Sequence, residues 1–106
     1  MSTTVYILPA FTILTTATFD RWRATLRDRQ ARMRITARLK RVEHGNVGHA
    51  KSVGGGVSEL RVDYGPGYRL YFTRRGFAVI VLLGGGNKST EAQDIKAAQA
   101  IAAQVE

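Results

Sequence analysis

Polar side chains recur at every second position in two neighbouring stretches of the chain. Glu59 and Arg61 are two residues apart in the first stretch, and Arg69 and Tyr71 are two apart in the second. Because side chains alternate across a pleated strand, all four share one face if the stretches are adjacent strands. Cleavage of RNA by its own 2′-hydroxyl needs a base, cations for the charge that develops on phosphorus, and an acid. The spacing therefore predicts a site for metal-free attack on a phosphate.

The same four residues also have a purely structural interpretation. Glu59 and Arg61 could pair with each other, or with Arg69, as an ion-pair network on the surface of the sheet. Tyr71 could be an ordinary strand residue that packs against its neighbours. Spacing alone leaves the catalytic and the structural interpretation open.

A glycine-rich segment, residues 84–90, follows an apolar run and precedes a predicted helix. It departs from the nucleotide-binding pattern G-x-x-x-x-G-K-[ST], because Leu82 and Asn87 stand where the two glycines should be. The sequence therefore argues against nucleotide hydrolysis. We expect a tight turn from strand to helix, with Lys88 near the helix N-terminus holding a phosphate of a larger ligand.

Basic residues outnumber acidic ones and are concentrated in one part of the chain. The 106 residues include 16 Lys and Arg against 8 Asp and Glu, a formal net charge of +8. Nine of the sixteen lie between Arg21 and Arg41. They form either a solvated helical face or a cationic wall toward RNA or an acidic protein segment. The candidate wall comprises Arg27, Arg34, Arg38 and Arg41, which do not all share one stripe, and further candidate RNA contacts are Lys51 and Tyr71.

Composition narrows the class of protein. The length predicts one domain over residues 1–106 with one modest core. The absence of cysteine excludes disulfides and thiolate metal sites, and His44 and His49 are too few for a metal site by themselves, so we expect no metal and no cofactor. No apolar run reaches the roughly 20 residues of a membrane helix and no signal peptide is evident, so we expect a cytoplasmic protein without a membrane partner.

Three helices are predicted from capping residues and apolar spacing. Thr18 can cap the first helix, and Asp28 can cap a second that ends at Gly45-Asn46. The apolar face of the second helix contains Ala31, Ile35, Leu39 and Val42. Ser89 or Thr90 can cap the last helix, whose apolar stripe contains Ala92, Ile95, Ala98, Ile101 and Val105.

Four strands complete the predicted fold. The first covers residues 5–8 and 11–16 and is interrupted by Pro9, which makes residues 1–10 a ragged extension of it. After a loop at residues 47–56 that includes a short extended piece, residues 57–64 and 68–73 form a hairpin. Following a turn at residues 74–76, residues 77–83 form a central strand buried on both sides. This order indicates an α+β fold, with two N-terminal helices and a C-terminal helix on a mainly antiparallel four-stranded sheet.

Several runs of the sequence together are specific for one family. They are Gly56-Val57-Ser58-Glu59-Leu60-Arg61, residues 64–72, residues 82–90 and Asp94-Ile95. These runs closely resemble the RelE/ParE superfamily of toxins, and more narrowly the HigB-like addiction module killer proteins of type II toxin–antitoxin systems. The resemblance extends from about residue 11 to about residue 105.

That resemblance implies a RelE-like fold and a metal-independent endoribonuclease that cuts messenger RNA, typically on the ribosome. It implies that Arg61, Arg69 and Lys88 stabilise charge in the transition state. Glu59 stands where the best-known RelE enzymes have a lysine, which leaves its role as base or structural acid open. Asp94 stands where those enzymes place a tyrosine, which leaves the general acid unassigned.

The resemblance also implies a partner and two rival functions. The partner is a small helix-turn-helix antitoxin that covers the active face, opposes its positive charge and forms a toxin–antitoxin hetero-oligomer. One rival function is ParE-like inhibition of DNA gyrase without any cleavage. The other is a family member without catalysis, whose arginine face only docks an acidic antitoxin tail.

Overall fold

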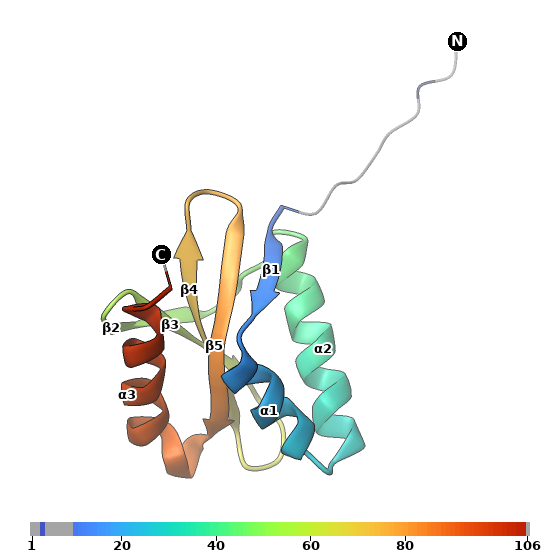
Figure 1. Ribbon diagram of the computed structural model, residues 1–106. Helices are drawn as coiled ribbons and strands as arrows, with labels where there is room; N and C mark the ends of the chain where they lie inside the picture. Colours follow the sequence, from blue (N-terminus) through green and yellow to red (C-terminus); the bar gives the residue numbers. More distant parts are fainter. Residues whose placement is uncertain (1–2, 4–9, 106) are drawn as a thin grey trace.

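Five strands form one mixed sheet in the computed structural model of the chain, which describes residue 3 and residues 10–105 (Figure 1). In chain order the elements are β1 (Thr12–Thr15), α1 (Ala17–Thr25), α2 (Arg29–Glu43), β2 (Ala50–Gly54), β3 (Val57–Val62), β4 (Tyr68–Arg75), β5 (Val79–Asn87), the 3₁₀ helix η1 (Lys88–Thr90) and α3 (Glu91–Ala102). The strand order across the sheet is β1-β5-β4-β3-β2. The β1–β5 pair is parallel, whereas the other three pairs are antiparallel.

This sheet corrects the predicted fold. The expectation of a four-stranded, mainly antiparallel sheet is wrong, because β2 adds a fifth strand and β1 pairs with β5 in parallel. β2 lies in the stretch predicted as a loop with a short extended piece. Its sequence has no alternating apolar pattern, and most of its residues are exposed. The strand forms through its backbone pairing with β3.

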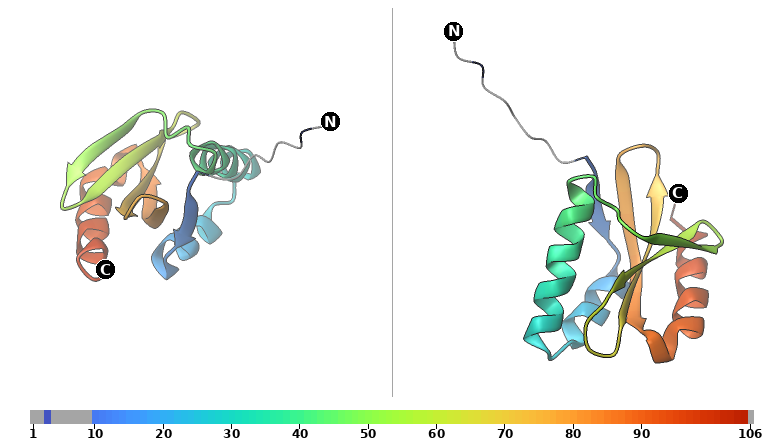
Figure 2. Two further views of the ribbon diagram at one scale, coloured as in Figure 1. Left: turned by 90° about the horizontal axis from the view of Figure 1, so that it is seen from above. Right: turned by 180° about the vertical axis from the view of Figure 1, so that it is seen from behind.

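Apolar side chains cover both faces of the sheet. α1 and α2 lie on one face, over a core that includes Phe19 and Ile35. α3 lies on the other face, over a core that includes Ala98 and Tyr71, and Figures 1 and 2 show it apart from α1 and α2. Of the central strand predicted at residues 77–83, the part from Ile80 to Leu83 is buried on both sides as expected. β5 contributes Ile80 and Leu82 to the first core and Val81 and Leu83 to the second.

Polar caps set the starts of the two N-terminal helices. Thr16, rather than the predicted Thr18, caps α1, because its hydroxyl oxygen accepts from the backbone N–H of Phe19 at 3.2 Å. The same hydroxyl donates to the carbonyl of Leu82 at 3.0 Å, which ties the start of α1 to β5. Asp28 caps α2 as predicted. The apolar face predicted for α2 is also confirmed, with the buried residues Ala31, Ile35, Leu39 and Val42.

The triple glycine lies within β5, so the prediction of a tight turn there is wrong. β5 continues through Asn87 before η1 begins. A Cβ atom on Gly85 would lie closer than 3.0 Å to the Trp22 ring of α1, and one on Gly86 would lie closer than 3.0 Å to the Asp94 carboxylate of α3. Glycine therefore lets helices on both faces approach the strand closely.

The β4–β5 hairpin is longer than predicted. β4 continues through Arg75, and the turn occupies residues 76–78 instead of residues 74–76. Phe77, which we expected in the central strand, is fully exposed at this turn. Gly76 has a φ of +62°, a conformation that glycine adopts without strain.

The N-terminal prediction is tested only in part. Its first segment, residues 5–8, lies outside the described residues, as does most of the extension over residues 1–10. The strand predicted at residues 11–16 is present at Thr12–Thr15. Among residues 10–105 no helix is both long and apolar enough to cross a membrane.

Candidate anion-binding groove

A groove of about 830 Å³ lies between α2 and the β2–β3 hairpin. In the view from behind (Figure 2, right), α2, the segment after it and this hairpin face the viewer. The α2 wall is lined by Arg34, Arg38 and Arg41, which follow helical spacing along one side of the helix. The opposite wall is lined by Lys51 of β2 and Arg61 of β3. Five basic side chains thus surround one groove, which makes it a favourable site for an anion.

Acidic and neutral groups complete the lining of this anion-binding groove. Glu59 lies on β3 and Asp63 just after its end, and His49 lies in the segment between α2 and β2. The carboxylates offset part of the positive charge, but basic groups still outnumber them. Asp63 and His49 are exposed, whereas Glu59 is buried.

Arg38 anchors the segment that leads from α2 to β2. Its side chain is mostly buried, and Nη2 donates to the carbonyl of Val47 at 2.6 Å. A Cβ atom on Gly48 would lie 3.0 Å from the same Nη2, so the backbone and the guanidinium are in close contact there. Burial, and next the nearby charge of Arg41, lower the pKa of Arg38 below its ordinary value. Arg38 therefore shapes the groove more than it offers a free cation.

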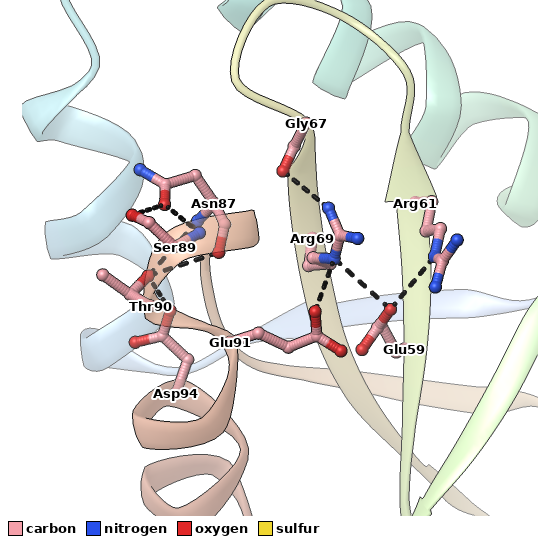
Figure 3. Close-up of polar contacts among 9 residues, drawn as sticks. All are labelled: Glu59, Arg61, Gly67, Arg69, Asn87, Ser89, Thr90, Glu91 and Asp94. Carbon is pink, nitrogen blue, oxygen red and sulfur yellow. Dashed lines mark hydrogen bonds and ion pairs between the residues drawn. The ribbon is translucent and has the colours of Figure 1, made fainter.

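An ion-pair network joins β3 and β4 to the start of α3 (Figure 3). Oε1 of Glu59 lies 3.3 Å from Nε of Arg61 and 3.5 Å from Nε of Arg69. Nε of Arg69 also lies 3.3 Å from Oε2 of Glu91, and its Nη1 donates to the carbonyl of Gly67 at 2.8 Å. Arg69 is thus held between two carboxylates and a backbone carbonyl.

Exposure separates the two strand arginines. The side chain of Arg61 is 53% exposed, whereas that of Arg69 is 8% exposed. β3 and β4 place them directly opposite each other, and Glu59 directly opposite Tyr71. The four residues that we expected to share one face are therefore close together. The structure nevertheless exposes Arg61 and buries the other three.

Three polar atoms in or near this network are buried without a hydrogen-bond partner among the described residues, namely Oε2 of Glu59, the hydroxyl of Tyr71 and Nε of Arg69, which is held by its ion pairs alone. Burial is the main cause that raises the pKa of Tyr71 above its ordinary value, and the negative charges of Glu59, Asp94 and Glu91 add to the shift. The Tyr71 phenol therefore stays protonated at neutral pH. We expected Tyr71 to contact RNA. Because the side chain is buried, this contact requires the surrounding side chains to move.

Lys88 lies away from the anion-binding groove. It is the exposed first residue of η1 and is not among the residues that line the groove. A Cβ atom on Gly67 would lie 3.9 Å from Cβ of Lys88, so this lysine neighbours the turn between β3 and β4. Asn87 caps η1 by accepting from the backbone N–H of Ser89 at 2.9 Å.

The structure thus divides the predicted site residues into two groups. The groove brings together Arg34, Arg38, Arg41, Lys51, Glu59 and Arg61, whereas its lining does not include Arg69, Tyr71 or Lys88. Sequence reasoning missed His49 and Asp63 as groove residues. Asp63 could have been found from its place two residues after Arg61, but the position of His49 depends on the pairing of β2 with β3.

Among residues 10–105 no group of three or more His, Cys, Asp or Glu side chains could hold a metal ion. The fold and the groove define a small basic α+β protein with a candidate anion-binding site. No family model matches the chain. It is 47% identical over 90 residues to an uncharacterized protein of Haemophilus influenzae, an alignment that covers 85% of this chain and 91% of that protein. The chain belongs to the same family as that Haemophilus influenzae protein.

Proposed function

We propose that this protein is the toxin of a type II toxin–antitoxin system and that it binds and cleaves messenger RNA in the cytoplasm without a metal ion. The observation that carries the proposal is the anion-binding groove, in which five basic side chains surround about 830 Å³. The resemblance of the sequence to the RelE/ParE superfamily supports the toxin role. The groove supports RNA as the target.

The groove suits the backbone of single-stranded RNA. Its cations come from both walls, so they can contact a backbone that lies between them. Arg34, Arg41 and Lys51 are exposed, so each can neutralise a phosphate and release its counterions. A strand of RNA lying along the groove would be held by α2 on one side and by β2 and β3 on the other.

Arg61 is the groove cation best suited to act on the reacting phosphate. Its ion pair with Glu59 uses Nε, and the guanidinium has two further nitrogen atoms that can donate to phosphate oxygens. A cation held in place before the reaction stabilises developing charge without reorganisation. In this role Glu59 positions Arg61 and does not need to contact the RNA.

Arg69 supports the site from within the protein. Because it is buried between Glu59 and Glu91, it orients the carboxylate that holds Arg61. RNA could reach Arg69 only after this network opened. We therefore assign transition-state stabilisation to Arg61 and a positioning role to Arg69.

A helix-turn-helix antitoxin remains the proposed partner in a hetero-oligomer. The basic groove would attract an acidic segment of that antitoxin, and such a segment would exclude RNA. The positive charge of the groove would also attract ribosomal RNA, which is a polyanion. The proposed place of action is therefore the ribosome.

Inducible expression in bacteria with mapping of RNA 5′ ends tests the proposal. We expect wild-type protein to create new cleavage sites and Arg61→Ala to reduce cleavage by about 10²-fold, the effect of removing one pre-positioned donor. Arg27→Ala is the matched control, because Arg27 is exposed but does not line the groove. If wild-type protein creates no new 5′ ends in cells and leaves messenger RNA intact on translating ribosomes, RNA cleavage is ruled out.

The burial of Arg69 favours one alternative, a protein that binds without cutting. As a ParE-like inhibitor it would block supercoiling by purified DNA gyrase and induce the SOS response. As a purely interacting family member it would be harmless when expressed alone, and Arg61→Ala would weaken antitoxin binding. Each outcome differs from the pattern expected for a ribonuclease.

A further inference from the structure

The segment between α2 and β2 brings an imidazole to the anion-binding groove. His49 is exposed and lines the groove together with Arg61 and Glu59. The other histidine, His44, is the C-cap residue of α2 and does not line the groove. The chain therefore contains one histidine at the candidate site and one outside it.

The position of His49 follows from the pairing of β2 with β3. Ala50 pairs with Leu60, and Lys51 pairs with Glu59. The pairing of β2 begins at Ala50, so His49 directly precedes the strand, and Arg61 directly follows Leu60 on β3. His49 and Arg61 both line the groove. The imidazole therefore lies at the same groove as the guanidinium that we assign to the reacting phosphate.

The backbone before His49 is held in place. Nη2 of Arg38 donates to the carbonyl of Val47 at 2.6 Å, and Gly48 has a φ of +64° against the same guanidinium. A side chain at position 48 would be strained in that conformation and would crowd Arg38. Anchoring of these two residues limits where the imidazole can lie, as a proton-transfer group requires.

We propose that His49 accepts the proton of the 2′-hydroxyl during RNA cleavage, an inference that rests on the RNA-cleaving function proposed above. The 2′-oxygen forms a bond to phosphorus while its proton passes to the neutral imidazole of His49. The bond between phosphorus and the 5′-oxygen breaks, and the 5′-oxygen takes a proton from water. The imidazolium then releases its proton to the hydroxide that remains. The products are a 2′,3′-cyclic phosphate and a 5′-hydroxyl.

The other proton acceptors in the groove are less suitable. Glu59 is buried and its Oε1 is shared by Arg61 and Arg69, and carboxylates as a class are weaker bases than imidazole. Imidazole is the side chain that changes charge between about pH 5 and 8, so it is suited to accepting a proton near neutrality. The charged groups that share the groove with it are the three arginines of α2, Lys51, Glu59, Arg61 and Asp63.

Single-turnover cleavage of messenger RNA on translating ribosomes tests the assignment. We expect His49→Gln to cleave at least about 10²-fold more slowly than wild type while binding RNA within about twofold of it. The variant should also lose the rise in rate between about pH 5 and 8 that a neutral imidazole produces. His44→Gln should match wild type in rate and pH profile. Added imidazole should restore part of the activity of His49→Gly, which a merely structural role would not allow.

The outcomes separate this inference from the proposed function. If wild-type protein leaves messenger RNA intact, both fall. If wild type cleaves and His49→Gln keeps its rate within about threefold with an unchanged pH profile, the assignment of His49 is wrong and RNA cleavage stands. The assignment is equally wrong if His49→Gln loses RNA binding along with rate and imidazole restores nothing.

Discussion

Glu59 and Arg61 lie two residues apart on β3 with 3.3 Å between Oε1 and Nε, yet the exposed fractions of their side chains are 1% and 53%. A buried carboxylate thus holds a half-exposed guanidinium in the anion-binding groove. The same carboxylate oxygen lies 3.5 Å from Nε of the buried Arg69. Glu59 therefore couples the proposed RNA contact to the interior of the protein.

Glu59→Gln should destabilise the protein by about 3 kcal/mol, because removing one partner of a buried ion pair leaves the other charge uncompensated. Arg69 would retain only Glu91 as an anionic neighbour in the network. Urea unfolding followed by circular dichroism measures the effect. Asp63→Asn, which removes an exposed carboxylate from the same groove, should change the free energy of unfolding by less than about 0.5 kcal/mol. Equal stabilities of the two variants would contradict the structural role of Glu59.

Alanine should reduce stability more at Gly86 than at Gly84, two residues earlier on β5. Gly86→Ala should cost about 1–3 kcal/mol or more, because its Cβ would overlap the Asp94 carboxylate. Gly84→Ala is the matched control, since its Cβ would lie 4.0 Å from the nearest side-chain atom, Cγ2 of Thr18, and Gly84 has no positive φ. Thermal unfolding of the two variants compares them directly. A Gly84→Ala protein less stable than Gly86→Ala would show that close approach of α3 does not explain the glycines.

Removal of groove cations should reduce the salt dependence of RNA binding. A plot of the logarithm of affinity against the logarithm of salt concentration has a negative slope. Arg34→Ala and Arg41→Ala should each make this slope less steep by about 0.7, the value for one phosphate of a single strand. Fluorescence anisotropy with a labelled single-stranded RNA measures this slope. Arg29→Ala removes an exposed charge from α2 outside the groove and should leave the slope unchanged. Identical slopes for all three variants would place RNA elsewhere on the surface.

The contact between Asp28 and Tyr64 should make stability depend on acid pH. The Tyr64 hydroxyl donates to Oδ2 of Asp28 at 2.9 Å, and this hydrogen bond is the main cause that lowers the pKa of Asp28 below its ordinary value. Because that pKa is lower in the folded protein than in the unfolded chain, the ionised carboxylate stabilises the folded protein. This stabilisation is fully present above about pH 4 and is lost as the pH falls further.

The Tyr64→Phe variant tests this linkage. Without the hydroxyl, the pKa of the Asp28 carboxyl should rise toward its ordinary value, and the acid-side loss of stability should become smaller. Titration of the Asp28 carboxyl by NMR provides the measurement. An Asp28 pKa that is the same in both proteins would assign the shift to the backbone N–H groups at the start of α2 instead.

Features that depend on neighbouring residues could be predicted from the sequence. Asp28 caps α2, and the apolar face of this helix is buried, because both depend on residues one to a few turns apart. The β3–β4 hairpin followed from alternation and from the turn at Gly65-Pro66-Gly67. The spacing of Glu59 and Arg61 left open whether they pair or serve a catalytic site, and the structure shows the pair.

Other features required contacts between segments distant in the chain. β2 has no apolar pattern and exists through its pairing with β3, and β1 joins the sheet through a parallel partner more than 60 residues away. The glycines of β5 are explained only by Trp22 and Asp94 on opposite faces. Alternation put Arg61 and Arg69 on one face, but Arg69 is buried beside Glu91 at the start of α3, whereas Arg61 lines the groove with His49. Tertiary packing decides which charged side chains meet solvent, because burial depends on every element that covers a residue and not on its neighbours in sequence.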